Sequence, residues 1–233
     1  MTTFIRRYEL DRTPPTRAQA ARDAARRALL PGLVILLGLV GIGFLITGPL
    51  GGLPGEAAIN DALVDSRTPF LNQVSFLISL VGNTEFVLGL GTLVIGLVWW
   101  RTREWWYAIV PAIAVALQAA IFMTSAAIVA RERPQVDQLD DAPPTSSFPS
   151  GHVGAAAAMY FTLALMAQRI PNPVLRWLAT AVCMVMPFAM AWSRLYRGMH
   201  SFTDVLFGFL NGALCAFLAW RYLRREVEPQ TRA

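Results

Sequence analysis

The sequence contains no lysine, only two cysteines and only two histidines, and charged residues make up 15% of its 233 positions. Cys183 and Cys215 both lie in apolar segments, which argues against a disulfide scaffold and against a thiolate metal site. All 20 basic residues are arginines, dispersed without an interleaved aromatic groove. The net charge of +5 therefore indicates contact with anionic lipid and argues against a nucleic-acid partner.

Hydrophobic residues make up 55% of the chain and collect in long runs between short charged stretches. A membrane-spanning helix needs about 20 mostly apolar residues. Six segments meet this requirement, namely residues 31–50, 84–100, 105–130, 151–168, 174–193 and 201–220. The stretch 60–82 is amphipathic and interrupted by charges and a proline, so we interpret it as an interfacial helix followed by a partly immersed segment. The sequence predicts an all-α, polytopic membrane bundle of about six transmembrane helices.

The distribution of arginine predicts the orientation of these spans, because cytoplasmic flanks are enriched in basic residues. With the N-terminus inside, fifteen of the 20 arginines are cytoplasmic, and the outer side holds only Arg67, Arg131, Arg133, Arg194 and Arg197. We therefore expect a multi-pass protein of the plasma membrane with both termini in the cytoplasm. The expected organisation is a basic cytoplasmic tail, a membrane domain and a second cytoplasmic tail, at residues 1–30, 31–222 and 223–233.

Both histidines lie in short polar clusters that this topology places on the outer membrane face. The clusters are residues 131–134 after the third span, 148–152 at the start of the fourth, and 193–204 between the fifth and sixth. Together they supply arginines, a hydroxyl, helix-end amides, two imidazoles and a carboxylate, which suit the cleavage of a phosphate ester. The loop 135–147 is acidic and contains Pro143 and Pro144, so it can fold over the site as a lid.

His200, His152 and Asp204 are the candidate catalytic residues. His200 and Asp204 are four positions apart and share one face of a helix, so the carboxylate can orient the imidazole and stabilise its charged form. This arrangement suits His200 as a nucleophile. His152 can protonate the departing oxygen and later activate water.

Arg133, Arg194, Ser150 and Gly151 are the candidate phosphate-binding residues. The two arginines can each hold phosphate oxygens through forked hydrogen bonds. Ser150 is placed to cap a helix, and the free amides that follow it, beginning at Gly151, point at a bound anion. No metal ion and no cofactor is required by this set of groups.

Other polar residues near the clusters have simpler interpretations. We interpret Arg131 as a solvated loop charge, and Arg197 and Tyr196 as anchors at the membrane interface. The acidic residues of the loop 135–147 are interpreted as a hydrated lid, because no metal-ligand spacing recurs among them.

The three clusters resemble the pattern of the type 2 phosphatidic acid phosphatase (PAP2) superfamily, which is K-x6-RP, PSGH and SR-x5-H-x3-D. Residues 149–152 match the second element and residues 193–204 match the third at every fixed position. Arg133-Pro134 matches the first element, but Ala126 stands where the family carries lysine. The resemblance covers about the C-terminal half through its motifs and implies a phosphohistidine intermediate on His200. It also implies the helical fold of chloroperoxidases, although the spans and the missing lysine argue against a vanadium-dependent haloperoxidase.

The alanine at position 126 removes one positive charge from the expected phosphate cradle. Losing such a contact costs about 1.5–3 kcal/mol if nothing compensates. Thr124 and Ser125 are close in sequence and can donate neutral hydrogen bonds. Weakened or altered phosphate recognition is therefore possible, but the nucleophile, the acid and both arginines are present.

The sequence as a whole predicts a metal-independent membrane lipid phosphatase that acts on the outer face. Undecaprenyl pyrophosphate is the favoured substrate, and phosphatidylglycerophosphate or phosphatidic acid are alternatives. Two other functions stay open, a lipid-phosphate binding or transfer protein with weakened or lost catalysis, and a lipid phosphotransferase. The expected partners are the lipid substrate and the bilayer, and the sequence carries no signal for an oligomeric state.

Overall fold

The computed structural model describes residues 2–141 and 145–225, and this part of the chain contains helices and no strands. Pro143 and Pro144 of the expected lid, and residues 226–233 of the expected C-terminal tail, lie outside the described residues. The elements are α1 (Thr2–Ile5), α2 (Arg7–Leu10), α3 (Arg17–Ala24), the π-helix η1 (Ala25–Leu29), α4 (Leu30–Thr47), the 3₁₀ helix η2 (Pro54–Glu56), α5 (Ala57–Asp65), α6 (Pro69–Val81), α7 (Thr84–Thr102), α8 (Trp105–Ala108), α9 (Val110–Val129), α10 (Gly151–Ala167), α11 (Pro173–Tyr196) and α12 (Phe202–Trp220).

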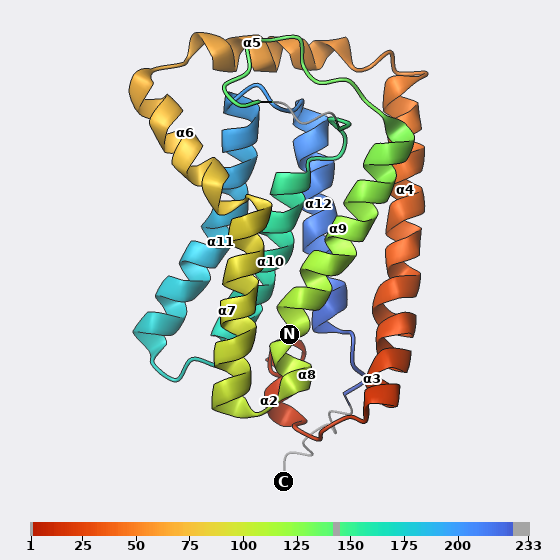
Figure 1. Cartoon of the computed structure of the whole chain (residues 1–233), viewed down its shortest axis with the longest axis vertical. Helices are drawn as coiled ribbons and strands as arrows, with labels where there is room; N and C mark the ends of the chain where they lie inside the picture. The colour runs from red at the N-terminus through yellow and green to blue at the C-terminus, as the bar shows by residue number, and fades with distance from the viewer. Residues whose placement is uncertain (1, 142–144, 226–233) are drawn as a thin grey trace.

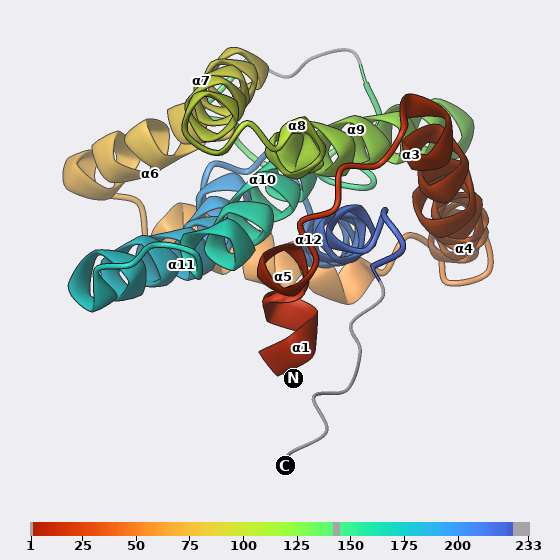
Figure 2. The ribbon, with the colours of Figure 1, turned by 90° about the horizontal axis from the view of Figure 1, so that it is seen from below.

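The long helices run side by side and form a bundle (Figure 1). Among the described residues, five segments are long and apolar enough to cross a membrane, namely Arg17–Thr47, Thr84–Thr102, Trp105–Val129, Pro173–Tyr196 and Phe202–Trp220. The remaining expected span, 151–168, corresponds to α10, which is 17 residues long. Helix α10 is central and packs against α7, α9, α11 and α12 (Figure 2). The all-α membrane bundle predicted from the sequence is confirmed.

The outer surface of the bundle is apolar, as a lipid-facing surface requires. Val34 on α4, Leu93 on α7 and Trp177 on α11 are 70%, 59% and 68% exposed. A group of buried polar side chains that includes Ser147, Arg194 and His200 lies toward one end of the bundle, where the loops that precede α10 and α12 meet. This inversion of the usual soluble pattern fits a protein whose solvent is lipid over most of its length.

The stretch 60–82 forms no span-length helix. Helix α5 lies across one end of the bundle, and α6 slopes from that end toward the start of α7 (Figure 1). Thr68 begins α6 as an N-cap whose side chain accepts from the Leu71 amide, and Pro69 occupies the first helical position. The transverse α5 and the short, oblique α6 agree with the interfacial helix and the partly immersed segment that were predicted for residues 60–82.

Helices α10 and α12 approach closely because glycines line their contact. A Cβ on Gly208 would overlap the carbonyl oxygen of Ser150, and a Cβ on Gly212 would overlap that of Gly154. The backbones therefore touch directly, and the Ser150 amide donates to the Asp204 carbonyl at 2.8 Å. This contact fixes the start of α10 relative to the start of α12, which are the two positions that carry the histidine motifs.

The N-terminal region packs on the bundle and is not a separate tail. Tyr8 is 1% exposed, and its ring lies 5.3 Å from that of Tyr107 and 5.0 Å from that of Trp220. Helix α3 continues through the π-helix into α4 without a break. The boundary expected at residue 31 is therefore not a structural boundary, because aromatic burial in this region extends the bundle beyond its long apolar runs.

Candidate active site

An apolar cavity of about 370 Å³ opens between α7, α9 and α10 and ends among polar side chains. Its walls are Val87, Leu88, Val115, Ala119, Phe122, Met123 and Ala155. Its polar end is formed by Arg133, His152, Arg194 and His200, together with Gly151. The structure therefore brings residues of all three sequence clusters to one place, at the α5 end of the bundle. The other two candidate residues, Ser150 and Asp204, are fully buried behind this lining.

Arg133 and Arg194 each leave one edge of the guanidinium group, formed by Nε and Nη2, without a hydrogen-bond partner among the described residues. Nη1 of Arg133 donates to the Met199 carbonyl at 2.7 Å, and Nη1 of Arg194 donates to Ser79 Oγ at 2.7 Å and to Asp140 Oδ2 at 2.8 Å. Within the described residues, Nε of both arginines has no hydrogen-bond partner, and Nη2 makes none either. A free Nε and Nη2 edge is the fork that binds two oxygens of a phosphate.

His200 is held in the tautomer that a nucleophile needs. Nδ1 lies 2.9 Å from the Ser147 carbonyl oxygen, which can only accept, so Nδ1 carries the proton and Nε2 keeps its lone pair. The imidazole is 3% exposed, and its burial lowers the pKa of His200 against the opposing effect of Asp204. The ring is therefore neutral at pH 7. Asn60 of α5 donates to the His200 carbonyl at 3.1 Å and fixes the backbone.

Asp204 supports His200 less directly than its spacing predicted. Its Oδ2 lies 3.8 Å from His200 Nδ1, while the Ser147 carbonyl makes the direct hydrogen bond to the ring. The carboxylate accepts from the Ser201 amide at 2.8 Å and from the Ser147 hydroxyl, and so completes a capping box at the start of α12. Ser147, which the motif analysis did not single out, is the link between the carboxylate and the imidazole.

The interpretation of Arg131 as a solvated charge is wrong. Its side chain is 7% exposed and donates to Asp204 Oδ1 at 2.6 Å and to Glu56 Oε2 at 2.9 Å. A fully buried carboxylate requires such a cation, because an unpaired charge in the interior is strongly unfavourable. Arg131 does not line the cavity beside Arg133 and Arg194, so it does not replace the charge of the missing lysine.

His152 and Ser150 stand at the start of α10. His152 Nε2 lies 3.0 Å from Asn83 Oδ1, and the imidazole borders the cavity. Ser150 occupies the N-cap position, but its hydroxyl makes no capping bond and has no partner among the described residues. The first amides of α10, from Gly151 onward, are therefore not capped by this side chain and suit an anion at the helix start.

The position of the family lysine offers no substitute cation. Ala126 is 6% exposed on α9, and neither it nor Thr124 or Ser125 lines the cavity. The Ser125 hydroxyl donates to the Ile121 carbonyl at 2.7 Å within its own helix. The neutral hydrogen bonds considered from the sequence are therefore not made at the candidate phosphate site, where Arg133 and Arg194 are the basic residues of the cavity lining.

The interpretation of Arg197 and Tyr196 as interface anchors is also wrong. Arg197 binds Asp140 through Nε at 2.8 Å and through Nη2 at 2.5 Å, and it is 4% exposed. The Tyr196 hydroxyl donates to Asn72 Oδ1 at 2.9 Å and is buried against α6. The end of α11 is covered by α6 and by the described part of the loop 135–147, and both side chains bind these segments.

Asp140 joins this loop to Arg194 of the candidate phosphate site. It binds both Arg197 and Arg194, and these arginines outweigh the effect of burial and hold the pKa of Asp140 below its ordinary value. Asp137 pairs with Arg67 at 3.4 Å, and the Leu139 amide donates to the Arg197 carbonyl at 3.1 Å. The described part of the loop is thus bound to the bundle at several points.

We expect Asp140→Asn to lower kcat/KM for a lipid phosphate by about 10- to 100-fold, mainly through KM, because a charge-assisted hydrogen bond contributes about 1.5–3 kcal/mol. Steady-state kinetics measures this effect. Asp137→Asn, the same change at an 83% exposed side chain in the same loop, is the control and should have little effect. The free energy of unfolding of wild type should approach that of Asp140→Asn as the pH falls through the lowered pKa of Asp140, because the carboxylate then becomes neutral. A fall in KM would contradict this role and mean that Asp140 competes with phosphate.

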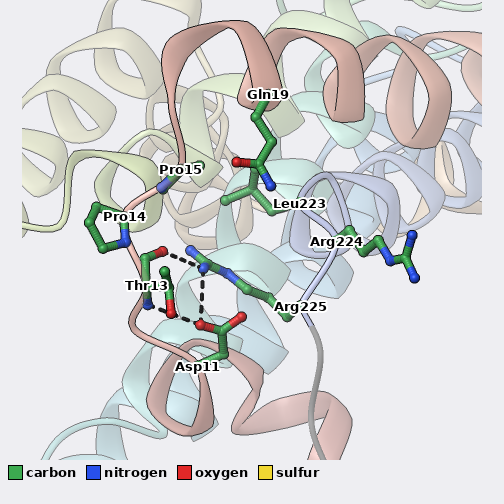
Figure 3. A pocket seen from close by; sticks show the side chains of 8 residues that line it. All are labelled: Asp11, Thr13, Pro14, Pro15, Gln19, Leu223, Arg224 and Arg225. Carbon is green, nitrogen blue, oxygen red and sulfur yellow. Dashed lines mark hydrogen bonds and ion pairs between the residues drawn. The ribbon is translucent and has the colours of Figure 1, made fainter.

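A second cavity, of about 300 Å³, lies at the opposite end of the bundle between the two terminal segments (Figure 3). One of its two arginines, Arg225, donates through Nη1 to the Thr13 carbonyl at 2.6 Å and pairs with Asp11 at 3.4 Å. Arg225 also lies over the rings of Tyr8 and Trp106. These contacts join the described N-terminal segment to residue 225, and we assign this region a structural role.

Comparison with known proteins agrees with this geometry. The model of the PAP2 superfamily matches residues 103–228. Phosphatidylglycerophosphatase B of Bacillus subtilis is 30% identical over 168 residues, which make up 70% of this chain and 80% of that protein. The crystal structure of a transmembrane PAP2 type phosphatidylglycerolphosphate phosphatase from Bacillus subtilis superposes with a TM-score of 0.69 at 26% identity, over 82% of this chain and 92% of that chain.

The crystal structure of Aquifex aeolicus LpxE matches with a TM-score of 0.56 at 17% identity, over 70% of this chain and 92% of that chain, and shows the fold alone. The fold and the comparisons together define a class, the multi-pass membrane lipid phosphatases. The chain belongs to the PAP2 superfamily.

Proposed function

We propose that this enzyme hydrolyses the head-group phosphate of a membrane lipid through a phosphohistidine on His200. The observation that carries the proposal is the cavity itself, whose apolar walls lead to two free arginine forks and two imidazoles. A lipid tail can occupy the walls while the phosphate binds Arg133 and Arg194. A water-soluble phosphate ester has no lipid tail to fill the apolar part of this cavity.

In the first step, Nε2 of His200 attacks phosphorus and the bond from phosphorus to the ester oxygen breaks. Protonated His152 gives its proton to the departing oxygen, so the lipid leaves as an alcohol. Arg133 and Arg194 stabilise the charge that builds on the phosphoryl oxygens, and the free amides at the start of α10 add to this field. The Ser147 carbonyl accepts from Nδ1 of His200 and stabilises the positive charge on the phosphorylated ring.

In the second step, water attacks the phosphohistidine. Neutral His152 takes a proton from this water, the bond from phosphorus to Nε2 breaks, and inorganic phosphate leaves. His200 returns to its neutral state and His152 is again protonated. Every group in this cycle belongs to the residues already placed, and no step requires a metal ion.

Phosphatidylglycerophosphate is the substrate that we propose first. The relative that is 30% identical is named for this activity, and two arginine forks without a third cation suit a single terminal phosphate. Undecaprenyl pyrophosphate, which the sequence favoured, carries a second phosphate for which the cavity lining offers no further basic residue. It and phosphatidic acid are the comparison substrates.

We further propose that the active site faces the outside of the plasma membrane. The supporting observations are the excess of arginines at the end of the bundle that holds α2, α3 and the end of α12, and the position of the site at the other end (Figure 1). Basic flanks favour the cytoplasm.

The detergent-purified protein should release phosphate from phosphatidylglycerophosphate in excess EDTA, with a kcat/KM at least about tenfold above that for undecaprenyl pyrophosphate or phosphatidic acid, a difference of about 1.4 kcal/mol in transition-state binding. Phosphate release with each lipid in matched micelles measures this. Adding an acceptor alcohol tests for phosphotransfer. A preference for the pyrophosphate would overturn the substrate assignment, and loss of activity in EDTA would overturn the metal-independent mechanism.

A further inference from the structure

The segment between α6 and α7 forms part of the active-site wall, although it precedes both histidine motifs and the residues matched by the family model. Gly82 and Thr84 line the cavity, and Asn83 between them reaches His152 at 3.0 Å. A Cβ on Gly82 would overlap the side chain of Met190 on α11, so this segment lies directly on the bundle. A Cβ at position 82 would also lie 3.6 Å from the carbonyl oxygen of His152, so the segment that carries Asn83 is next to the start of α10.

Asn83 stands at the N-cap of α7, but it does not cap this helix. Asparagine is among the preferred N-cap residues because its side chain accepts from the first free amides. Asn172 does this for α11, where its Oδ1 accepts from the amides of Val174 and Leu175. The side chain of Asn83 makes no such bond and is directed to the imidazole instead.

We propose that Asn83 is a positioning residue for His152, the proposed acid and base, so that this inference rests on the proposed function. An amide oxygen can only accept, so the hydrogen bond places a proton on Nε2 and leaves Nδ1 to exchange a proton with the substrate. The bond persists when the ring becomes charged. Asn83 therefore fixes both the orientation of the ring and the atom that transfers the proton.

The surroundings of His152 make such a partner necessary. The charged and titratable groups that face it are Arg194 on α11, Arg133 and Asp140 of the loop before α10, and His200 before α12. Two of these are cations beside a ring that must itself become cationic. A neutral acceptor supports the charged ring without adding a negative charge that would compete with the phosphate for Arg133 and Arg194.

The test compares Asn83→Leu and Asn83→Asp with wild type, using phosphatidylglycerophosphate and p-nitrophenyl phosphate. The leaving group of the lipid needs a proton and that of the aryl ester does not. For Asn83→Leu we expect kcat/KM for the lipid to fall about 10- to 100-fold, which is part of the total contribution of general acid catalysis. With the aryl ester, kcat/KM should change little. For Asn83→Asp we expect activity with the lipid to be retained. The alkaline limb of the pH profile of kcat/KM should move to higher pH, because a carboxylate stabilises the charged ring of His152.

Asn172→Asp, the same change at an N-cap that does cap its helix, is the matched control and should leave the pH profile unchanged. Equal losses on both substrates in Asn83→Leu, or an unchanged profile in a folded Asn83→Asp, would overturn the proposal and assign Asn83 a structural role only. An Asn83→Asp variant as impaired as Asn83→Leu would also overturn it, since the amide would then act as a donor. Failure of the proposed function can be distinguished from failure of the Asn83 proposal, because in the first case wild type itself would release no phosphate from the lipid.

Discussion

Replacing His200 by alanine is expected to lower phosphate release by at least about 10⁴-fold, as the loss of a nucleophile does in enzymes with covalent intermediates. The physical reason is that His152, the other imidazole among the described lining residues, has Nε2 bonded to Asn83 and uses Nδ1 for proton transfer to the leaving oxygen, so it is not placed to replace His200 as the nucleophile. Phosphate release from the lipid measures the loss. The fold should be retained, because the ring makes one hydrogen bond among the described residues, to the Ser147 carbonyl.

The two histidines make it possible to assign the covalent intermediate. With p-nitrophenyl phosphate, wild type and His152→Ala should both form an acid-labile phosphoenzyme, and in His152→Ala it should accumulate because the base for its hydrolysis is missing. His200→Ala should form none. Rapid quenching with labelled substrate measures this. Labelling of His200→Ala, or release of the lipid phosphate at the wild-type rate by that variant, would contradict the phosphohistidine mechanism.

Replacing Arg131 by methionine is expected to reduce the free energy of unfolding by about 3–5 kcal/mol, because it leaves the buried carboxylate of Asp204 without its cation. Asp204 is fully buried, and the guanidinium also binds Glu56, Thr203 and the Gly52 carbonyl. One side chain thus joins the segment before α5 to the start of α12. Thermal unfolding in detergent measures the loss, and kcat should fall as well because Ser147 and His200 lose their support.

Arg169→Met is the matched control for this substitution. Arg169 forms a half-buried ion pair with Glu104 at 2.7 Å, far from the cavity, so its loss should reduce stability and leave kcat near that of wild type. If both variants kept the wild-type kcat, the link from Arg131 through Asp204 to His200 would be wrong. Arg131→Lys should be intermediate, since an ammonium keeps the charge but cannot reproduce the fork to Asp204 and Glu56.

The sequence predicted the class of fold because a membrane span can be recognised from the composition of one contiguous segment. Runs of about 20 apolar residues must be helical in lipid, where every backbone group needs an internal partner. The transverse α5 and the short α6 followed from Asp61, Asp65 and Pro69 in the same way. The N-terminal packing of Tyr8 did not follow, because a single aromatic residue in a basic segment carries no periodic signal.

The residues bordering the cavity were also predictable, for a different reason. His152, Arg194 and His200 lie in short motifs whose spacing is set by helix ends, so each motif orients its own side chains locally. Arg131, Arg197 and Asp140 were misread because their roles depend on partners far away in the chain. Arg131 binds a carboxylate 73 positions away, and Arg197 binds one 57 positions away. A charge in a loop has no local feature that distinguishes solvent from such a partner.

The sequence by itself determined that this protein is a helical membrane bundle, and it predicted a phosphate site built from two histidines and two arginines, because spans and motifs are local properties. The tertiary structure decided which atoms of those residues are free. The Ser147 carbonyl fixes the tautomer of His200, Asp140 and Met199 leave one edge of each arginine unpaired, and Asn83 reaches His152 from another helix. Each of these contacts is made between segments that only the packing of α6, α10, α11 and α12 brings together.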